Sequence, residues 1–553
     1  MKTFWTTFYS YKGGVGRSLA LANVATLLVQ RGNRVVLLDF DLEAPGLDTF
    51  SEFADAKGKA GIVEYVAEFQ RSQSAPDISS FVYPVRLPEQ LRGKLWIMPA
   101  GRKDAAYNHL LARTRWAEIY DSGLGAAFIE NWKLSIEQAF QPDYVLVDSR
   151  TGLTEVGGVC TTAFPDLVVM LFGLNEQNVE GTATVARHIR EADLERPPQL
   201  HFVATPIPNL PPDKKGLLRE RLEAAEKTLG IELGSNSIRY WPPAALTERL
   251  FVLEENFREP GLVQDHKTLC QRITEFNRNG LDFLAAQTEG TLKTDDAQRA
   301  QKLGEVLARE FSNRPEAIFL RSRLARMDGR GEESLRLAEQ AFELDPLYAD
   351  AFDFLSSHYQ RNRQPEKVER LCERVLESPS KLPAPRRNQV LMKLAELRMS
   401  LRKHEQAADH YRELNKSTVD HHDGETQLAY AFNAAESSRR AGRSVDPKTW
   451  KTIVDVFEKL PAFAGLPTMT ANHCQAMHIA FAMIGDLSTA KDCLHKSQRA
   501  AETVNDLEEI FSVRDYRMVN REEFIATNHE LLGALDRGEL WDGTKLPAKG
   551  IAP

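Results

Sequence analysis

A glycine-rich segment near the start of the chain carries residues suited to binding phosphate. It reads Lys12-Gly-Gly-Val-Gly-Arg-Ser18, after an apolar run at residues 3–9 and before a helix expected over residues 19–30. Glycines let the backbone turn tightly and point its N–H groups at phosphate oxygens, and the helix N-terminus adds partial positive charge. The Ser18 hydroxyl can ligate Mg²⁺. The candidate nucleotide-binding residues here are Lys12, Gly13, Gly14, Val15, Gly16, Arg17, Ser18 and Leu19.

Carboxylates follow two further apolar runs. The first run ends in Asp39-Phe-Asp41, and the second, Tyr144–Asp148, ends in Asp148. Ligands of open α/β sheets bind at the carboxyl ends of the strands, so these side chains should lie beside the glycine-rich loop. An apolar strand ending in Asp is typical of a residue that holds Mg²⁺ through water or through Ser18. The alternative, a solvated acidic strand end, is disfavoured by the spacing from the loop.

These residues need a sheet to position them. As far as about residue 290, short apolar runs alternate with helical stretches, including expected crossover helices at 174–190 and 218–229. Runs of this kind are typical of strands buried on both faces of a parallel sheet. We therefore predict an α/β fold with a doubly wound, mostly parallel sheet. The expected strands are residues 3–9, 34–39, 94–98, 144–148, 167–172 and 200–205.

From about Asp295 onward the expected strands give way to helices with weak internal repeats. The spacing of large and small residues resembles the tetratricopeptide (TPR) pattern, which implies helix pairs stacked into a solenoid. The alternative is a generic helical bundle, and beyond Thr418 the two are equally favoured. We place a P-loop domain at 1–287, a linker at 288–297, TPR-like repeats at 298–542 and a tail at 543–553. The repeat positions are Ile318, Ser322, Ser334, Ala338, Ala341 and Pro346; Phe352, Leu355, Ser356, Tyr359, Val368, Cys372 and Val375; Leu391, Leu394, Ala395, Ala407, Tyr411 and Leu414; and, in a degenerate copy, Cys474, Ala480, Ala490 and Leu494.

The phosphate loop departs twice from the standard P-loop pattern, with Tyr11 at the first glycine and Arg17 at the lysine. It resembles the deviant Walker A motif of the ParA/MinD ATPases, K-G-G-x-G-K-[ST], some members of which carry arginine as here. The resemblance implies ATP and Mg²⁺ as cofactors and a nucleotide-dependent homodimer in which Lys12 reaches phosphates across the interface. It assigns Asp41 to the attacking water and Asp39 to the vicinity of the Mg²⁺ shell. The implied catalytic residues are Lys12, Arg17 and Asp41, and the metal-site residues are Ser18, Asp39, Asp41 and Asp148.

Two positions bear on the rate and the specificity of the reaction. Arginine keeps the charge of the usual lysine but replaces a compact ammonium with a planar fork, so Arg17 leaves the rate of hydrolysis open, from slow to none. Thr205-Pro206 stands where relatives contact the base with Asn-Arg, which leaves adenine specificity open. Arg150 is interpreted either as a γ-phosphate contact or, equally, as a surface or cap residue.

Composition limits the classes of function. The net charge of −8 argues against general nucleic-acid binding as the main role but is compatible with a local basic patch. Five scattered cysteines without a C-x-x-C pair indicate buried thiols in a reducing compartment. His421-His422-Asp423 is interpreted as a polar loop, with a metal site as the less favoured alternative. The start of the chain has no leader pattern and no run is long enough to span a bilayer, so we expect a cytoplasmic protein.

The resemblance, with a repeat domain attached, favours an ATP-dependent switch whose repeats bind a partner protein or peptide in a groove. Similar fusions occur in bacterial signalling and antiphage-type loci, which is an analogy of architecture. The sequence leaves open two alternatives, a nucleotide-binding structural protein that does not turn over and a ParA-like DNA-positioning ATPase. The tail is unlike a membrane-targeting helix, and the paired cysteines of metal-cluster carriers are absent.

Overall fold

The computed structural model describes residues 2–114, 125–194, 196–254, 257–417, 424–459, 466–505 and 508–547. The chain forms two compact units, Met1–Leu337 and Ala338–Pro553. Among the described residues, no helix is long and apolar enough to cross a membrane. All five cysteines are buried as free thiols, as their scattered spacing predicted.

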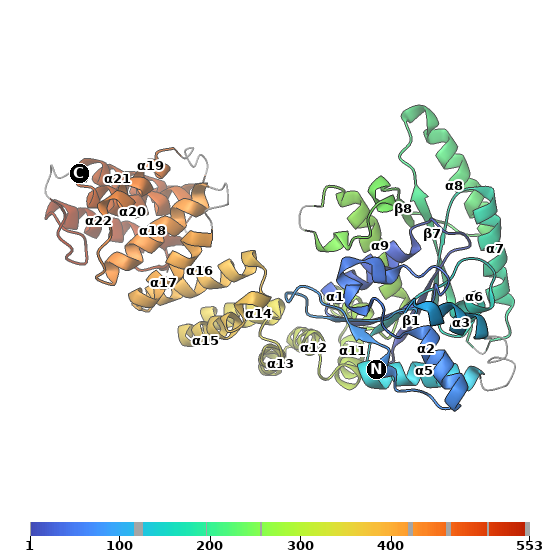
Figure 1. Ribbon diagram of the computed structural model, residues 1–553. Helices are drawn as coiled ribbons and strands as arrows, with labels where there is room; N and C mark the ends of the chain where they lie inside the picture. Colours follow the sequence, from blue (N-terminus) through green and yellow to red (C-terminus); the bar gives the residue numbers. More distant parts are fainter. Residues whose placement is uncertain are drawn as a thin grey trace. The chain divides into compact units, whose positions relative to one another are not determined.

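An eight-stranded sheet forms the centre of the first unit (Figure 1). Its order is β3-β4-β2-β5-β1-β6-β7-β8, with only β3 antiparallel to its neighbour. This is the predicted doubly wound, mostly parallel sheet. The strands are β1 (Phe4–Tyr9), β2 (Arg34–Asp39), β3 (Tyr83–Pro84), β4 (Lys94–Met98), β5 (Tyr144–Asp148), β6 (Leu167–Phe172), β7 (Gln199–Ile207) and β8 (Ser237–Arg239).

Helices cover both faces of this sheet, and alternate side chains of each strand enter different cores. Phe4 and Phe8 of β1 pack with the face covered by α1 and α9, whereas Trp5 packs with the opposite face. Both faces are therefore dry, which explains why the central strands read as continuous apolar runs. The helices are α1 (Arg17–Gln30) and α9 (Pro260–Phe276) on one face, and α2 (Ile62–Ser72), α5 (Gly125–Phe140), α6 (Glu155–Thr162), α7 (Glu176–Glu191) and α8 (Lys215–Leu229) on the other, with α3 (Ala105–Arg113) packed on α2.

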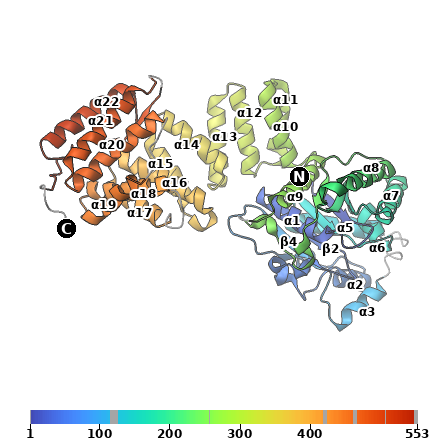
Figure 2. The ribbon, with the colours of Figure 1, turned by 90° about the horizontal axis from the view of Figure 1, so that it is seen from above.

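The first unit continues into helices beyond the predicted domain boundary. The segment 288–297, predicted as a linker, is instead the end of α10 (Leu281–Thr294) and the start of α11 (Ala297–Glu310). Its polar composition was misleading, because Thr288 and Thr291 are fully buried and donate hydrogen bonds from their hydroxyls to carbonyls of the preceding turn. Figure 2 shows α10, α11 and α12 (Pro315–Met327) side by side, followed by α13 (Gly331–Leu344).

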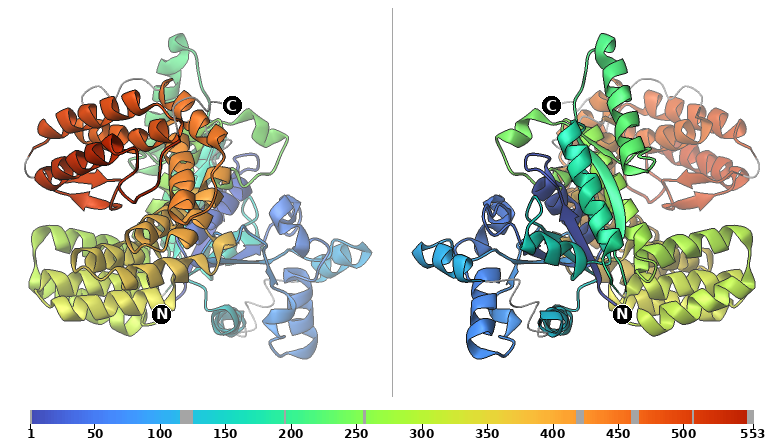
Figure 3. Two further views of the ribbon diagram at one scale, coloured as in Figure 1. Left: turned by 90° about the vertical axis from the view of Figure 1, so that its left-hand side faces the viewer. Right: turned by 90° about the vertical axis from the view of Figure 1, so that its right-hand side faces the viewer.

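The second unit is built from helices that each pack against the next in sequence. Figure 3 shows them, coloured from yellow to red. Of the predicted repeat positions, only Pro346 is not buried. The helices are α14 (Ala349–Arg361), α15 (Pro365–Leu376), α16 (Ala384–Ser400), α17 (His404–Ser417), α18 (Gly424–Arg440), α19 (Pro447–Phe457), α20 (Pro467–Met483), α21 (Leu487–Glu502) and α22 (Arg521–Asp536).

One β-hairpin interrupts the helices of the second unit. It consists of β9 (Ile510–Ser512) and β10 (Arg517–Val519), paired antiparallel. No strand was predicted in this region, because three-residue strands are too short to show an alternating pattern. His421, His422 and Asp423, predicted to form a polar loop, lie outside the described residues, as does the end of the tail from residue 548.

Gly61 offers a test of the packing beside the site edge of the sheet. A Cβ built on Gly61 would lie 1.8 Å from the backbone oxygen of Pro99, which follows β4. We expect Gly61→Ala to reduce the free energy of unfolding by about 1–3 kcal/mol, because backbone must move to make room. Urea unfolding of the full chain measures the change. Gly216→Ala is the control, because Gly216 is exposed in α8 and a Cβ added there would meet no atom within 4 Å. This variant should be neutral or stabilise the protein by about 0.5–1 kcal/mol. An equal loss in both variants would contradict this explanation.

Candidate nucleotide-binding site

The glycine-rich loop joins the carboxyl end of β1 to the N-terminus of α1, as predicted. Gly14 and Gly16 have φ of 81° and 77°, in the left-handed region that other residues enter only at a cost. A Cβ built on Gly13, Gly14 or Gly16 would meet no atom within 4 Å. The loop is therefore an open cradle of exposed backbone at a helix N-terminus, the arrangement that binds phosphate oxygens.

Arg17 lies at the centre of a buried cluster. Its side chain is 6% exposed and makes two ion pairs, from Nε to Asp148 Oδ1 at 2.5 Å and from Nη2 to Asp41 Oδ2 at 2.7 Å. Ser18 Oγ donates to the other oxygen of Asp148 at 2.5 Å. The structure thus brings together four residues that the sequence analysis selected from three separate segments.

Asp39 completes the cluster from the neighbouring strand. It is paired with Asp148 in the register of β2 and β5, and its carboxylate accepts from the backbone N–H groups of Asp41 and Leu47, each at 3.3 Å. Burial raises the pKa of Asp39 well above its ordinary value, and the charge of Asp148 raises it further. Asp39 lies behind the loop that begins at Asp41 and orders its backbone.

The charges of the cluster are unbalanced. Burial raises the pKa of Asp148, although Arg17 and Ser18 oppose the shift. Burial by itself lowers the pKa of Arg17, but Asp148 and Asp41 more than compensate, so its pKa is raised and the guanidinium stays charged. A single guanidinium therefore pairs with two carboxylates, Asp41 and Asp148, which favours binding of a further cation.

The donor set fits Mg²⁺ bound together with phosphate. In the described part of the chain, no group of three or more His, Cys, Asp or Glu side chains is placed to hold a metal by itself. Magnesium usually takes one or two carboxylates and completes its shell with water and substrate phosphates. Ser18 and Asp148 supply an adjacent hydroxyl and carboxylate. Arg17 Nη1 is buried without an acceptor, and a phosphate oxygen would provide one.

Lys12 points to a different partner. Its ammonium donates to Gln177 Oε1 at the start of α7 and is only partly buried. The structure therefore does not bring Lys12 into the Arg17 cluster. Tyr11 packs beside it against the same helix, where a Cβ at Gly181 would lie 2.2 Å from the Tyr11 ring. Gln177 and Gly181 were not predicted from the sequence, although an isolated glycine inside a helix can mark a position of close packing.

The loop that follows Asp41 is held by residues that the sequence analysis also missed. Lys103 Nζ donates to Asp48 Oδ1 at 2.6 Å and to the Pro45 carbonyl at 3.1 Å. The Tyr107 hydroxyl donates to the Leu42 carbonyl at 2.6 Å. Both come from the segment after β4, and no local motif announces their role because it depends on tertiary contact.

Two further predicted positions have defined places. Thr205 and Pro206 are joined by a cis peptide bond. Thr205 contacts the glycine-rich loop, because its Oγ1 donates to the Val15 carbonyl at 3.2 Å. Leu19 is half-buried on the first turn of α1. Arg150 forms an ion pair with Glu43, which supports the surface-pair interpretation over the phosphate contact.

The chain matches one family model and resembles several solved structures. The model of the CobQ/CobB/MinD/ParA nucleotide binding domain matches residues 6–327. Among solved structures, the MinD cell division protein of Aquifex aeolicus is 17% identical over 49% of this chain and 97% of its own, with a TM-score of 0.33. The Pyrococcus furiosus cell division ATPase MinD is 16% identical over 50% and 99%, with a TM-score of 0.37. A ParA family ATPase from Chlorobium tepidum is 16% identical over 49% and 99%, with a TM-score of 0.35. A search of curated proteins gave no match.

Proposed function

Because the chain belongs to the CobQ/CobB/MinD/ParA nucleotide-binding family, we propose that it is an Mg²⁺-dependent ATP switch that dimerises when ATP is bound. The observation that carries the proposal is the Arg17 cluster. A charged guanidinium whose Nη1 amino group is unpaired sits between two carboxylates, beside an open cradle of backbone donors. A triphosphate would satisfy the arginine, and the metal would supply the positive charge that the carboxylates lack.

Lys12 supports the dimerisation part of the proposal. Its ammonium lies at the rim of the loop, on Gln177, rather than among the carboxylates. A lysine held there by a neutral amide can exchange that contact for an anionic one at little cost, since both partners are partly solvated. We infer that this contact is given up for the phosphates of a nucleotide in a facing subunit.

The helices of the second unit are the part of the chain that we propose binds a partner. Their sequential stacking and buried repeat positions are features of a TPR-like array, and such arrays present concave surfaces to peptides or helices. We propose that they bind a partner protein. A place in bacterial signalling or antiphage defence is part of this proposal and rests on the analogy of architecture.

The state of Asp41 favours a second candidate function. Asp41, the residue proposed to position the attacking water, is ion-paired with Arg17. If the pair persists with nucleotide bound, Asp41 is not free to orient water, and the protein is a nucleotide-binding scaffold that does not turn over. Steady ATP hydrolysis that Asp41→Ala abolishes, with nucleotide binding retained, supports the switch. Binding without turnover in the unaltered protein supports the scaffold.

The mass of the protein in solution tests the switch directly. Light scattering with Mg²⁺ and a non-hydrolysable ATP analogue should give twice the mass found with ADP. Lys12→Ala should abolish the doubling, because the contact across the interface is lost. Lys57→Ala, which removes an exposed lysine outside the loop, should leave it unchanged. The same mass in every nucleotide state would contradict the proposal.

A further inference from the structure

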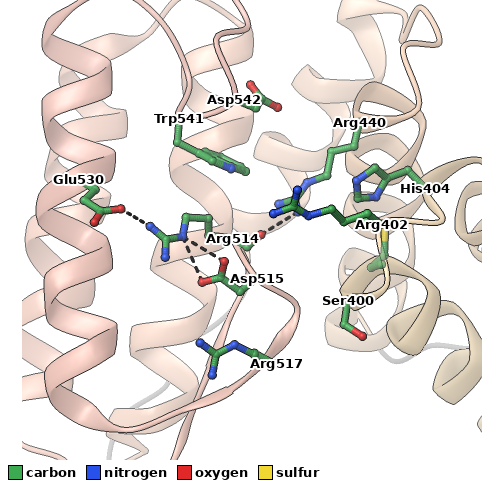
Figure 4. Close-up of a pocket in the computed structure, with 11 residues that line it drawn as sticks. Ser400, Arg402, His404, Arg440, Arg514, Asp515, Arg517, Glu530, Trp541 and Asp542 are labelled. Atoms are coloured by element: carbon green, nitrogen blue, oxygen red, sulfur yellow. Dashed lines mark hydrogen bonds and ion pairs between the residues drawn. The ribbon is translucent and has the colours of Figure 1, made fainter. Parts of the chain in front are cut away.

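A cavity of about 700 Å³ lies within the second unit (Figure 4). It is lined by residues of the turn after α16, the end of α18, the β9–β10 hairpin and the region in and after α22. Four arginines line it, with Arg402 and Arg440 on one side and Arg514 and Arg517 on the other. We propose that this cavity binds a small organic anion that carries two or more phosphate or carboxylate groups. The site does not depend on nucleotide binding by the first unit.

The carboxylates of the cavity already have cationic partners. Arg514 donates from Nε to Asp515 at 3.1 Å and from Nη1 to Glu530. Asp542 accepts from Arg439 Nη1 at 2.6 Å. Each of these acidic side chains therefore has an arginine partner, and Asp515 and Glu530 share the guanidinium of Arg514.

Two of the four arginines, Arg402 and Arg517, have donors that the acidic residues of the cavity do not occupy. Among the described residues, the exposed Arg402 side chain has no hydrogen-bond or ion-pair partner, although a guanidinium offers five N–H donors. Arg517 makes its ion pair with Glu523, which does not line the cavity. Planar guanidinium groups bind carboxylate and phosphate oxygens in pairs. The unused binding capacity of the cavity is thus for anions.

The pKa of His404, which also lines the cavity, is affected by the same positive charges. Burial lowers the pKa of His404, and the positive charges of Arg440, Arg402 and Arg439 lower it further, against an opposing effect of Glu436. A further positive charge at this position is therefore disfavoured by burial and by the neighbouring arginines. An entering anion would meet the same field with the favourable sign.

The hairpin that presents Arg514 and Arg517 is held in place by hydrogen bonds with α18 and α20. Arg440 donates to the carbonyls of Val513 and Arg514, each at 2.8 Å. The N–H of Val513 donates to Gln475 Oε1 at 2.8 Å, and the Tyr516 hydroxyl donates to Asn433 Oδ1 at 2.9 Å. A turn fixed by α18 and α20 loses little freedom when a ligand binds, which favours affinity.

The form of the cavity favours a compact ligand over an extended peptide. Residues from separate elements line one cavity of about 700 Å³, which falls within the range of roughly 300–1,000 Å³ typical of small-molecule sites. Trp541 forms part of the wall, with Arg440 stacked over its ring at 4.9 Å. A groove for an extended peptide would instead run along several successive repeats.

Hydrogen exchange of the full chain, read by mass spectrometry, can locate binding. The probes are pyrophosphate and citrate, each compared with chloride at equal ionic strength. We expect slower exchange in residues 510–519 and 399–405 with at least one probe. Slowing by pyrophosphate alone assigns a phosphate ligand, and slowing by citrate alone a carboxylate. Because the readout is regional, pyrophosphate bound only at residues 10–19 is recognised as binding to the phosphate loop, and it overturns this proposal while leaving the ATP switch intact.

Matched variants test the arginines. Arg402→Ala and Arg517→Ala should each lower the apparent affinity for the probe about tenfold or more, because each removes charge-assisted hydrogen bonds. The affinity is measured from the slowing of exchange as the probe concentration rises. Arg443→Ala is the control, since Arg443 lies outside the cavity and pairs with Glu405 and Asp409. Unchanged slowing in the two cavity variants, or no slowing with either probe, would overturn the proposal.

Discussion

Alanine at position 17 is expected to weaken ATP binding about a thousandfold. Two charge-assisted hydrogen bonds from a guanidinium contribute roughly 1.5–3 kcal/mol each, and the variant also leaves Asp41 and Asp148 without a buried cation beside the phosphates. Lysine at the same position restores the charge, so Arg17→Lys should bind ATP within a few-fold of the unaltered protein. Calorimetric titration with Mg²⁺ and a non-hydrolysable analogue measures both.

Arg17→Lys also separates binding from turnover. A lysine cannot hold Asp148 and Asp41 together through a planar fork, so it should release Asp41 and raise the rate of hydrolysis. Arg150→Ala is the neighbouring control and should change affinity little, because Arg150 pairs with Glu43 at the surface. Unchanged ATP affinity in Arg17→Ala would exclude Arg17 as a phosphate ligand. A melting curve without nucleotide shows whether that variant is still folded.

The sequence predicts the positions of the site residues better than their contacts. The bounds of β2, β4, β5 and β6 agree with the predicted runs, because strands buried on both faces are apolar without interruption. The topology of a parallel sheet then brings their carboxyl ends to one edge. The pairing of Arg17 with both Asp41 and Asp148 could not be predicted, since it depends on side-chain conformations that no spacing encodes.

Elsewhere the prediction failed where local composition and tertiary burial disagree. Polar residues such as Thr288 and Thr291 read as a linker, yet they bury inside helices by donating to their own backbone. Lys103 contacts a loop more than fifty residues away in sequence, and a single lysine carries no local signal of such a contact. The β9–β10 hairpin is invisible for a different reason, because its strands are only three residues long.

Removing the carboxylate of Glu436 is expected to have the largest effect on stability in the second unit. Glu436 is fully buried in α18 and accepts from Arg439 at 2.8 Å and from Arg440 at 2.7 Å. Glu436→Ala leaves two largely buried guanidinium groups without their shared carboxylate, which should cost about 3–5 kcal/mol. Hydrogen exchange of α18 and α20 in the full chain measures the loss regionally, so an effect in the first unit is not mistaken for it.

An exposed glutamate provides the comparison. Glu405 is 77% exposed and pairs with Arg443 at 2.9 Å. A solvated pair of this kind contributes about 0–1 kcal/mol, so Glu405→Ala should leave exchange in α18 nearly unchanged. Similar losses in the two variants would contradict the importance assigned to the buried ion cluster.

Acidification should act on the same cluster with a defined sign. Burial alone raises the pKa of Glu436, but Arg440 and Arg439 outweigh it and hold the pKa below the ordinary 4.5. The unfolded chain therefore binds the proton first, so the stabilisation by Glu436 is complete above pH 4.5 and is lost as the pH falls through the folded pKa. Glu436→Gln, which has no such proton to bind, should lose less stability over this range. Arg440 also holds the hairpin that bears Arg514 and Arg517. Protection of residues 510–519 from hydrogen exchange should therefore fall over the same pH range in the unaltered protein. An identical acid response in Glu436→Gln would exclude Glu436 as the titrating group.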